Sequence, residues 1–83
     1  MYYIYLIQNE QKKIYYGYTN DLKRRLLEHN QIHKGFTNGH KWKLIYCEAY
    51  LSESDAKERE IHLKKHGQAL RRLKSRIKSS LNL

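Results

Sequence analysis

Three short runs rich in aromatic and apolar residues lie in the first fifty positions, at residues 2–7, 14–18 and 42–50. Tyrosine and β-branched residues dominate these runs, which is typical of β-strands. The polar segment 8–13 separates the first two runs, so we expect an antiparallel hairpin with a long loop. Side chains alternate between the two faces of a strand, but the sequence alone does not set the register between strands.

Helical spacing follows the second run and the third. Leu22 and Leu26 lie four residues apart after Asn20 and Asp21, either of which suits a helix N-cap, and they predict a helix that ends near Gln31. The acidic and serine-rich segment 52–55 predicts the start of a second helix, which we expect Gly67 to close as a C-cap. A third helix is predicted from apolar residues at helical spacing, namely Leu70, Leu73, Ile77 and Leu81.

These elements predict one α+β domain over residues 1–83. It has the order β-β-α-β-α-α and a three-stranded antiparallel sheet flanked by helices. A chain of 83 residues has room for one small core and a shallow cleft, but not for a second domain or a deep cavity.

The chain is strongly basic, with a formal net charge of +9. Such a charge favours a polyanionic partner, nucleic acid first and an acidic membrane surface second. Two segments carry the cations that we expect to touch nucleic acid. The first is the basic loop 33–41, which alternatively is a plain connector, and the second is the predicted third helix. Their candidate contacts are Lys34, Lys41, Arg71, Arg72 and Lys74.

The single cysteine, Cys47, excludes an internal disulfide and suggests a reducing compartment. It lies in an apolar run, so we expect it to be a small core residue. No apolar run approaches the roughly 20 residues that a membrane span needs, and no signal peptide is visible. We therefore predict a cytoplasmic protein with no membrane partner.

One residue breaks the apolar pattern of the second helix. Ala56, Glu60 and Leu63 fall on one helical stripe, so Glu60 is a carboxylate where an apolar residue is expected. Because an unpaired buried charge is unfavourable, Glu60 needs Arg25, a metal ion or solvent as a partner. Arg25 and His29 are four residues apart and stack on adjoining turns of the first helix.

Several of these residues stand in the order of a known set of motifs. Tyr3-Ile4-Tyr5 is similar to the glycine–hydrophobic–tyrosine motif of the GIY-YIG nucleases, with Tyr3 in place of the glycine. Tyr15-Tyr16-Gly17 resembles their second motif. Arg25, His29 and Glu60 match the family's helix arginine, the histidine that follows it, and its metal-binding glutamate. The resemblance covers about residues 1 to 75 and is closest to compact standalone members.

The resemblance implies a metal-dependent DNA endonuclease whose catalytic residues are Tyr5, Tyr15, Arg25, His29 and Glu60. Glu60 is then the ligand of one divalent ion, Mg²⁺ or Mn²⁺, and Arg25 binds phosphate with its planar fork. Tyr15 is the candidate base, although an ordinary phenol has a pKa of about 10 and needs nearby positive charge. Tyr5 is expected to position water or phosphate, and His29 to relay a proton.

Two departures and two alternatives accompany this interpretation. Tyr18 stands where some members of the family carry a lysine. Some members also have an asparagine near the C-terminus, and we do not assign its role to Asn82.

The first alternative is a nucleic-acid-binding module of the same fold without turnover. The second is a basic RNA- or ribosome-associated protein that works through its third helix. The expected substrate is single-stranded or structured DNA, and the sequence leaves the oligomeric state open.

Overall fold

The computed structural model describes residues 1–31 and 40–83. Its strands are β1 (Tyr2–Gln8), β2 (Ile14–Thr19) and β3 (Lys43–Tyr50), which form one antiparallel sheet in the order β2-β1-β3. Its helices are α1 (Leu22–Asn30), α2 (Glu53–Lys65), α3 (Gly67–Arg76) and α4 (Lys78–Leu81). The predicted α+β class and element order are confirmed, and the short α4 is an addition to them.

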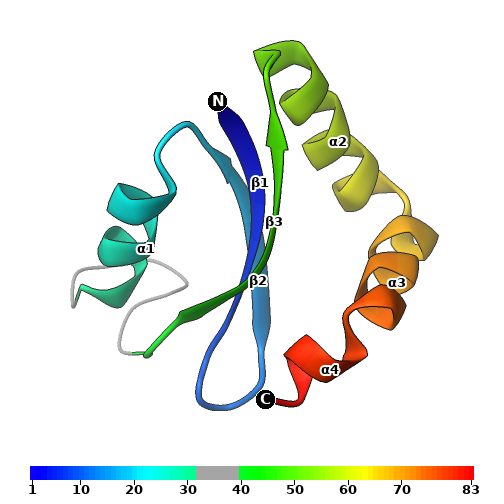
Figure 1. Cartoon of the computed structure of the whole chain (residues 1–83). Helices are drawn as coiled ribbons and strands as arrows, with labels where there is room; N and C mark the ends of the chain where they lie inside the picture. Colours follow the sequence, from blue (N-terminus) through cyan, green and yellow to red (C-terminus); the bar gives the residue numbers. More distant parts are fainter. Residues whose placement is uncertain (32–39) are drawn as a thin grey trace.

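The sheet separates the helices into two layers (Figure 1). Helix α1 covers one face, and α2, α3 and α4 run along the other. The central strand β1 contributes side chains to a hydrophobic core on each side of the sheet, because alternate side chains point to opposite faces. Ile4 and Leu6 pack with Leu63 and Leu73 under the C-terminal helices, whereas Tyr5 and Ile7 pack with the buried Trp42 on the α1 side. We call these sides the α2 face and the α1 face.

The register between β1 and β2 brings the two tyrosine motifs of the hairpin together on the α1 face. Tyr5 lies opposite Gly17, and Ile7 lies opposite Tyr15. Tyr5 and Tyr15 are therefore diagonal neighbours on one face, a separation that aromatic rings can bridge. This register is the relation that the sequence left open.

Helix ends agree with the expected capping at two places. Asp21 accepts a hydrogen bond from the Arg24 backbone N–H at 3.1 Å, and the Ser52 hydroxyl faces the Asp55 backbone N–H at 3.5 Å. The prediction that Gly67 closes the second helix is wrong, since α2 ends at a C-cap on His66 and Gly67 is the first residue of α3. The third predicted helix breaks at Ile77 into α3 and α4.

The prediction for Cys47 is also wrong. Cys47 pairs with Tyr5 across the sheet but is exposed, because β3 is an edge strand. A register shift opposite Leu6 and Ile7 changes which β3 residues face the helices, so that Ile45 packs there together with Tyr46. In the described part of the chain, no helix is long and apolar enough to cross a membrane.

Candidate active site

The Tyr5 hydroxyl lies at the centre of a polar cluster on the α1 face. Tyr5 is only 2% exposed, and its oxygen lies 2.8 Å from Nε2 of His29. Nε of Arg25 donates to the same oxygen at 3.3 Å. Arg25 and His29 reach it together because residues four apart stack on one side of α1. Arg25 and His29, which were predicted as site residues on the first helix, thus lie beside Tyr5, the first of the two predicted tyrosines.

The donors and acceptors of this cluster define its protonation state. A guanidinium can only donate, so the Tyr5 oxygen accepts from Arg25; the Tyr5 hydroxyl donates to His29 when Nε2 of the imidazole carries no proton. Burial, and after it the positive charge of Arg25, lower the pKa of His29. Burial also raises the pKa of Tyr5, against the opposing effect of Arg25. Both groups are therefore neutral near pH 7.

Gly17 makes room for the Tyr5 hydroxyl. A Cβ atom at Gly17 would lie 2.8 Å from that oxygen and 3.0 Å from the ring carbon that bears it. Real Cβ atoms do not approach other atoms so closely. Gly17 is therefore needed for a close side-chain approach, which is one of the two uses that a strand glycine serves.

Tyr15 lies beside this cluster and contacts it through its ring. Its centroid is 4.9 Å from that of His29 and 6.5 Å from that of Tyr5. Trp42 packs edge-on against the other side, at 6.3 Å. Trp42 is held in turn by the Asn30 side chain, which accepts from its backbone N–H at 2.6 Å and donates to its carbonyl at 2.9 Å. Asn30 thereby anchors the residue that packs against Tyr15.

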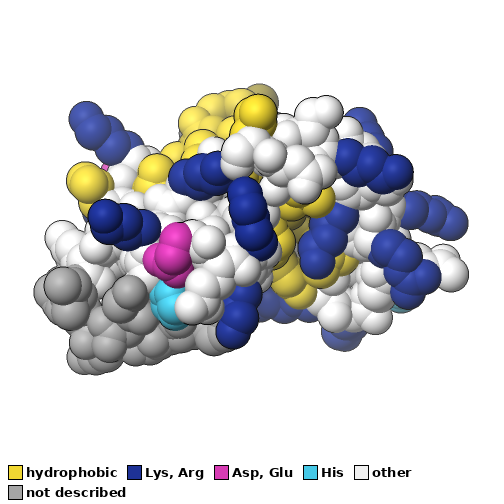
Figure 2. Space-filling model, turned by 90° about the horizontal axis from the view of Figure 1, so that it is seen from below, with side chains coloured by type: hydrophobic (Ala, Val, Ile, Leu, Met, Phe, Trp, Pro, Cys, Tyr) yellow, Lys and Arg dark blue, Asp and Glu magenta, His cyan; other side chains and the backbone are white. Residues whose placement is uncertain are grey.

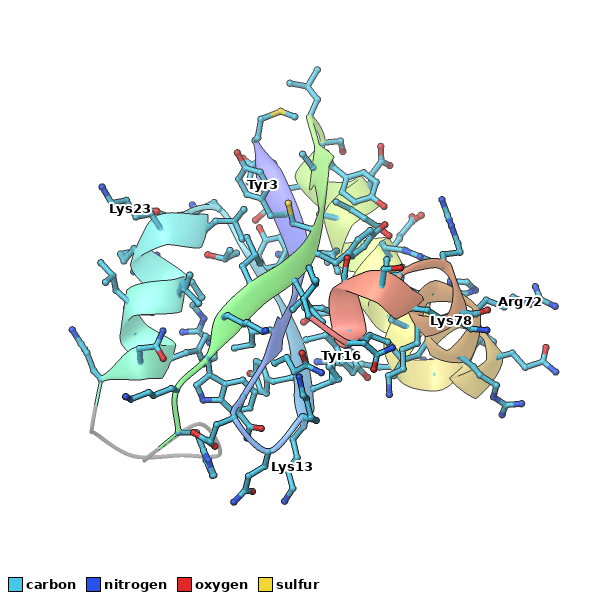
Figure 3. The ribbon with its side chains drawn as sticks, turned by 60° about the horizontal axis from the view of Figure 1, so that its bottom comes forward. Tyr3, Lys13, Tyr16, Lys23, Arg72 and Lys78 are labelled. Atoms are coloured by element: carbon cyan, nitrogen blue, oxygen red, sulfur yellow. The ribbon has the colours of Figure 1, made fainter. Side chains whose placement is uncertain are left out.

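Glu60 reaches the cluster around the free edge of β2. It lines a hollow of ≈ 360 Å³ together with Tyr15 of the α1 face and Tyr16 of the α2 face. Both faces contribute because β2 is an edge strand, so no further strand separates them. Figure 3 shows Tyr16 between the sheet and the helices. The Glu60 carboxylate is close enough to make a small contribution to the raised pKa of Tyr5, after burial.

Glu60 and Arg25 each form an ion pair, but not with each other. Glu60 Oε2 lies 3.4 Å from Lys64 Nζ, one turn further along α2, and the Glu60 side chain is 23% exposed. Arg25 pairs with Glu28 at 3.1 Å. The structure therefore gives Glu60 a lysine partner instead of Arg25. The spacing of four residues between Glu60 and Lys64 was the signal that could have revealed it.

The surroundings of Glu60 fit a hydrated divalent ion. Among the described residues no group of three or more His, Cys, Asp or Glu side chains gathers to enclose a metal. A single carboxylate in an open hollow suits Mg²⁺, which keeps several waters and takes further ligands from substrate phosphates. The Lys64 pair is an i,i+4 contact between an exposed lysine and the half-buried Glu60, worth roughly 0.3–0.5 kcal/mol, so it can yield to an ion.

Those predicted nucleic-acid contacts that the structure describes lie away from Tyr5. Lys34 lies outside the described residues. Lys41 is exposed beside the β1–β2 turn, where its backbone N–H donates to Glu10 at 2.8 Å. Arg71 and Arg72 are exposed on α3, and Lys74 is half-buried there. Lys and Arg side chains are spread over the end of the molecule seen in Figure 2, and many lie on its helical side around a hydrophobic hollow.

Comparison with known proteins places this domain in a class. A family model described as the GIY-YIG catalytic domain matches residues 1–75, so the chain is a nuclease-type domain. The chain belongs to the GIY-YIG family. It is similar to the UPF0213 protein of Clostridium perfringens strain 13, with 33% identity over 67 residues, which are 78% of this chain and 72% of that protein. No solved structure matches the chain at comparable significance.

Proposed function

We propose that this protein is an endonuclease that hydrolyses DNA phosphodiester bonds with the help of one divalent metal ion. GIY-YIG nucleases act on nucleic acid and generally use such ions, and the family match covers every candidate residue. The observation that carries the proposal is the position of Tyr15. Its ring packs on His29 of the buried cluster, while the same residue lines the hollow that holds Glu60.

The two tyrosines have different roles in this proposal. The Tyr5 hydroxyl is buried and its hydrogen bonds are used by Arg25 and His29, so Tyr5 positions these side chains. Tyr15 opens onto the Glu60 hollow, and we assign it to the attacking water as the general base. His29 contacts both rings, and its lowered pKa keeps it neutral and able to accept a proton in this cluster.

Arg25 is the phosphate-binding group of the proposal. It uses Nε for Tyr5 and NH1 for Glu28, and 41% of its side chain is exposed. It also lines a shallow hollow with Arg24, Tyr18 and Thr19. A substrate phosphate can replace the exposed Glu28 contact, and the guanidinium fork then stabilises charge that develops on phosphorus.

Glu60 would hold the metal ion, assisted by water and the substrate. A bound divalent ion supplies charge neutralisation at the phosphate and helps to ionise the attacking water. Mg²⁺ and Mn²⁺ both suit one carboxylate with water ligands.

The reducing compartment that the lone Cys47 suggests is consistent with a cytoplasmic protein.

Single-stranded or structured DNA is the proposed substrate. Tyr15 and Tyr16 line the hollow and are only partly buried, so they can stack on unpaired bases. Equal cleavage rates on a single strand and on its intact duplex, measured at the same salt concentration, would contradict this preference.

The decisive experiment compares wild type, Glu60→Gln and Glu58→Gln on labelled single-stranded, duplex and branched DNA. Each protein is assayed with Mg²⁺, with Mn²⁺ and with a chelator. Glu58 is exposed on the same helix, so Glu58→Gln makes the same chemical change outside the hollow. We expect cleavage only with metal, a loss of about 10³-fold in Glu60→Gln, and no more than a small change in Glu58→Gln.

Two outcomes would overturn the proposal. If wild type binds DNA but cuts none of the substrates with either metal, the protein is a non-catalytic binding module of the same fold. If it binds RNA far more tightly than DNA and charge reversal at Arg71, Arg72 and Lys74 abolishes that binding, the RNA-associated alternative replaces the nuclease.

A further inference from the structure

A second hollow lies on the other flank of α2. It has a volume of ≈ 400 Å³ and lies at the elbow where α2 meets α3. Helix α2 contributes Arg59, His62 and His66, which recur at helical spacing on one side of the buried stripe of Ala56 and Leu63. Glu60 and Lys64 fall on the opposite side of that stripe. The two hollows are therefore separated by α2, about one helix diameter or ~10 Å.

Three of the eight described residues that line this elbow pocket are arginines. Helix α3 adds Arg72 and Arg76, together with Gln68, Ala69 and Leu73. None of the described residues that line the pocket is acidic. Glu48 of β3 accepts hydrogen bonds from Arg59, through Nε at 3.0 Å and NH2 at 3.0 Å. Arg59 is thus neutralised, whereas Arg72 and Arg76 bring positive charge to the pocket without such a partner in its lining.

The donors of the pocket are arranged for an oxyanion. NH1 of Arg59 lies 3.2 Å from Nδ1 of His62 and can only donate, so Nδ1 accepts and Nε2 carries the ring proton. The His66 ring lies beside it, with 5.0 Å between the centroids. The first turn of α3 begins here with no acidic residue and no side-chain cap, and the Ala69 N–H already donates to the His66 carbonyl at 2.8 Å. Two helices thus bring arginine, histidine and glutamine side chains that can donate hydrogen bonds to one opening.

We infer that the elbow pocket is a binding site for a phosphate group, carried by a nucleic-acid strand or free in solution. Arg72 and Arg76 are its principal charged ligands, and His62 and the first turn of α3 add neutral donors. Figure 3 shows Arg72 extending from α3 away from the sheet, where a strand can reach it. Where the phosphate belongs to DNA, the inference rests on the proposed function, and the pocket then anchors the substrate outside the catalytic hollow.

The first test uses inorganic phosphate and ¹⁵N-labelled full chain. We expect saturable shifts of the Gln68 and Ala69 amide signals, and an affinity that falls about tenfold in Arg72→Gln and in Arg76→Gln. The control is Arg71→Gln, which removes the same charge from the neighbouring position of α3 but does not line the pocket. Its affinity should change less than twofold. Equal losses in Arg71→Gln and Arg72→Gln, or shifts that do not saturate, would overturn the site. The same spectra show whether each variant is folded.

The second test distinguishes the two sources of the phosphate. Binding of labelled single-stranded DNA is measured by fluorescence anisotropy in the Glu60→Gln background, so that no cleavage is required. If the strand is the source, Arg72→Gln and Arg76→Gln weaken binding about tenfold more than Arg71→Gln, and phosphate competes. If all three weaken DNA binding equally while the phosphate site is intact, free phosphate is the ligand. Neither arm depends on turnover, so a failed nuclease assay leaves this inference to be judged separately.

Discussion

Two clusters of tyrosine and arginine lie on opposite faces of the sheet, and they differ in how their charge is balanced. On the α2 face, Glu48 accepts hydrogen bonds from Arg59, from the Tyr46 hydroxyl at 2.8 Å and from the Tyr50 hydroxyl. On the α1 face, the centre of the cluster is the neutral Tyr5 hydroxyl, and the Arg25 carboxylate partner is the exposed Glu28.

The titration behaviour follows from this difference. Burial by itself raises the pKa of Glu48, but hydrogen bonds from Arg59, Tyr50 and Tyr46 together lower it. Burial and then the Glu48 contact raise the pKa of Tyr50 to about 12. Every strong group of that cluster is satisfied within the fold. The Tyr5 cluster instead leaves part of a guanidinium for an outside anion. We interpret the first as structural and the second as functional.

The largest expected contrast is between Arg25→Lys and Arg59→Lys. An ammonium cannot reproduce the planar fork, so Arg25→Lys should slow single-turnover DNA cleavage about 10²-fold while the chain stays folded. Arg59→Lys alters the structural cluster and should change the cleavage rate only a few-fold. Similar losses in both variants would remove the functional distinction between the clusters.

A stability contrast is expected for Glu48→Gln and Glu28→Gln. The Arg59 side chain is 23% exposed and loses its counter-ion in Glu48→Gln, so the free energy of unfolding should fall by about 2 kcal/mol. Glu28 lies in exposed ion pairs, and Glu28→Gln should change it by less than about 0.5 kcal/mol. Urea unfolding of both variants measures the difference, and equal values would show that Glu48 is not a structural acid.

A smaller effect is expected for Gly17→Ala. The added Cβ would displace the Tyr5 hydroxyl from Arg25 and His29, and should lower the free energy of unfolding by about 1.5 kcal/mol. Because Tyr5→Phe removes the oxygen that clashes, the double variant should lose less than the sum of the two single variants. Strict additivity in this double-mutant cycle would show that Gly17 acts on the backbone alone.

The smallest effect is a pH dependence from His29. Its pKa is lowered by burial and Arg25, with Glu28 opposing, so the folded protein resists a proton that the unfolded chain accepts. The free energy of unfolding should therefore be level above the unfolded pKa of about 6.5 and fall below it, by no more than about 1.4 kcal/mol per pH unit. His29→Gln should flatten this slope between pH 5 and 6.5, whereas His62→Gln at an exposed position should retain it. A slope unchanged in His29→Gln would contradict the neutral imidazole.

Much of the fold was predictable because its signals are local. Aromatic and β-branched runs mark the strands, and the Asp21 and Ser52 caps mark two helix starts within a few residues of chain. The prediction that Gly67 ends the second helix was wrong. A glycine after a basic helical turn suits a C-cap, but here the chain turns directly into α3. The prediction that Cys47 lies in the core was wrong because an apolar run does not reveal that its strand lies at the edge of the sheet.

The candidate site was likewise predictable only in part. The sequence by itself determined that Arg25 and His29 share one side of α1, because their spacing equals the helical repeat. It also marked Tyr5, Tyr15 and Glu60 by motif order. Tertiary structure decided that Tyr5 lies opposite Gly17, that Glu60 meets Tyr15 around the edge of β2, and that α2 and α3 enclose a basic pocket. Register, edge position and the angle between helices depend on packing between distant segments, and no local period of the sequence encodes them.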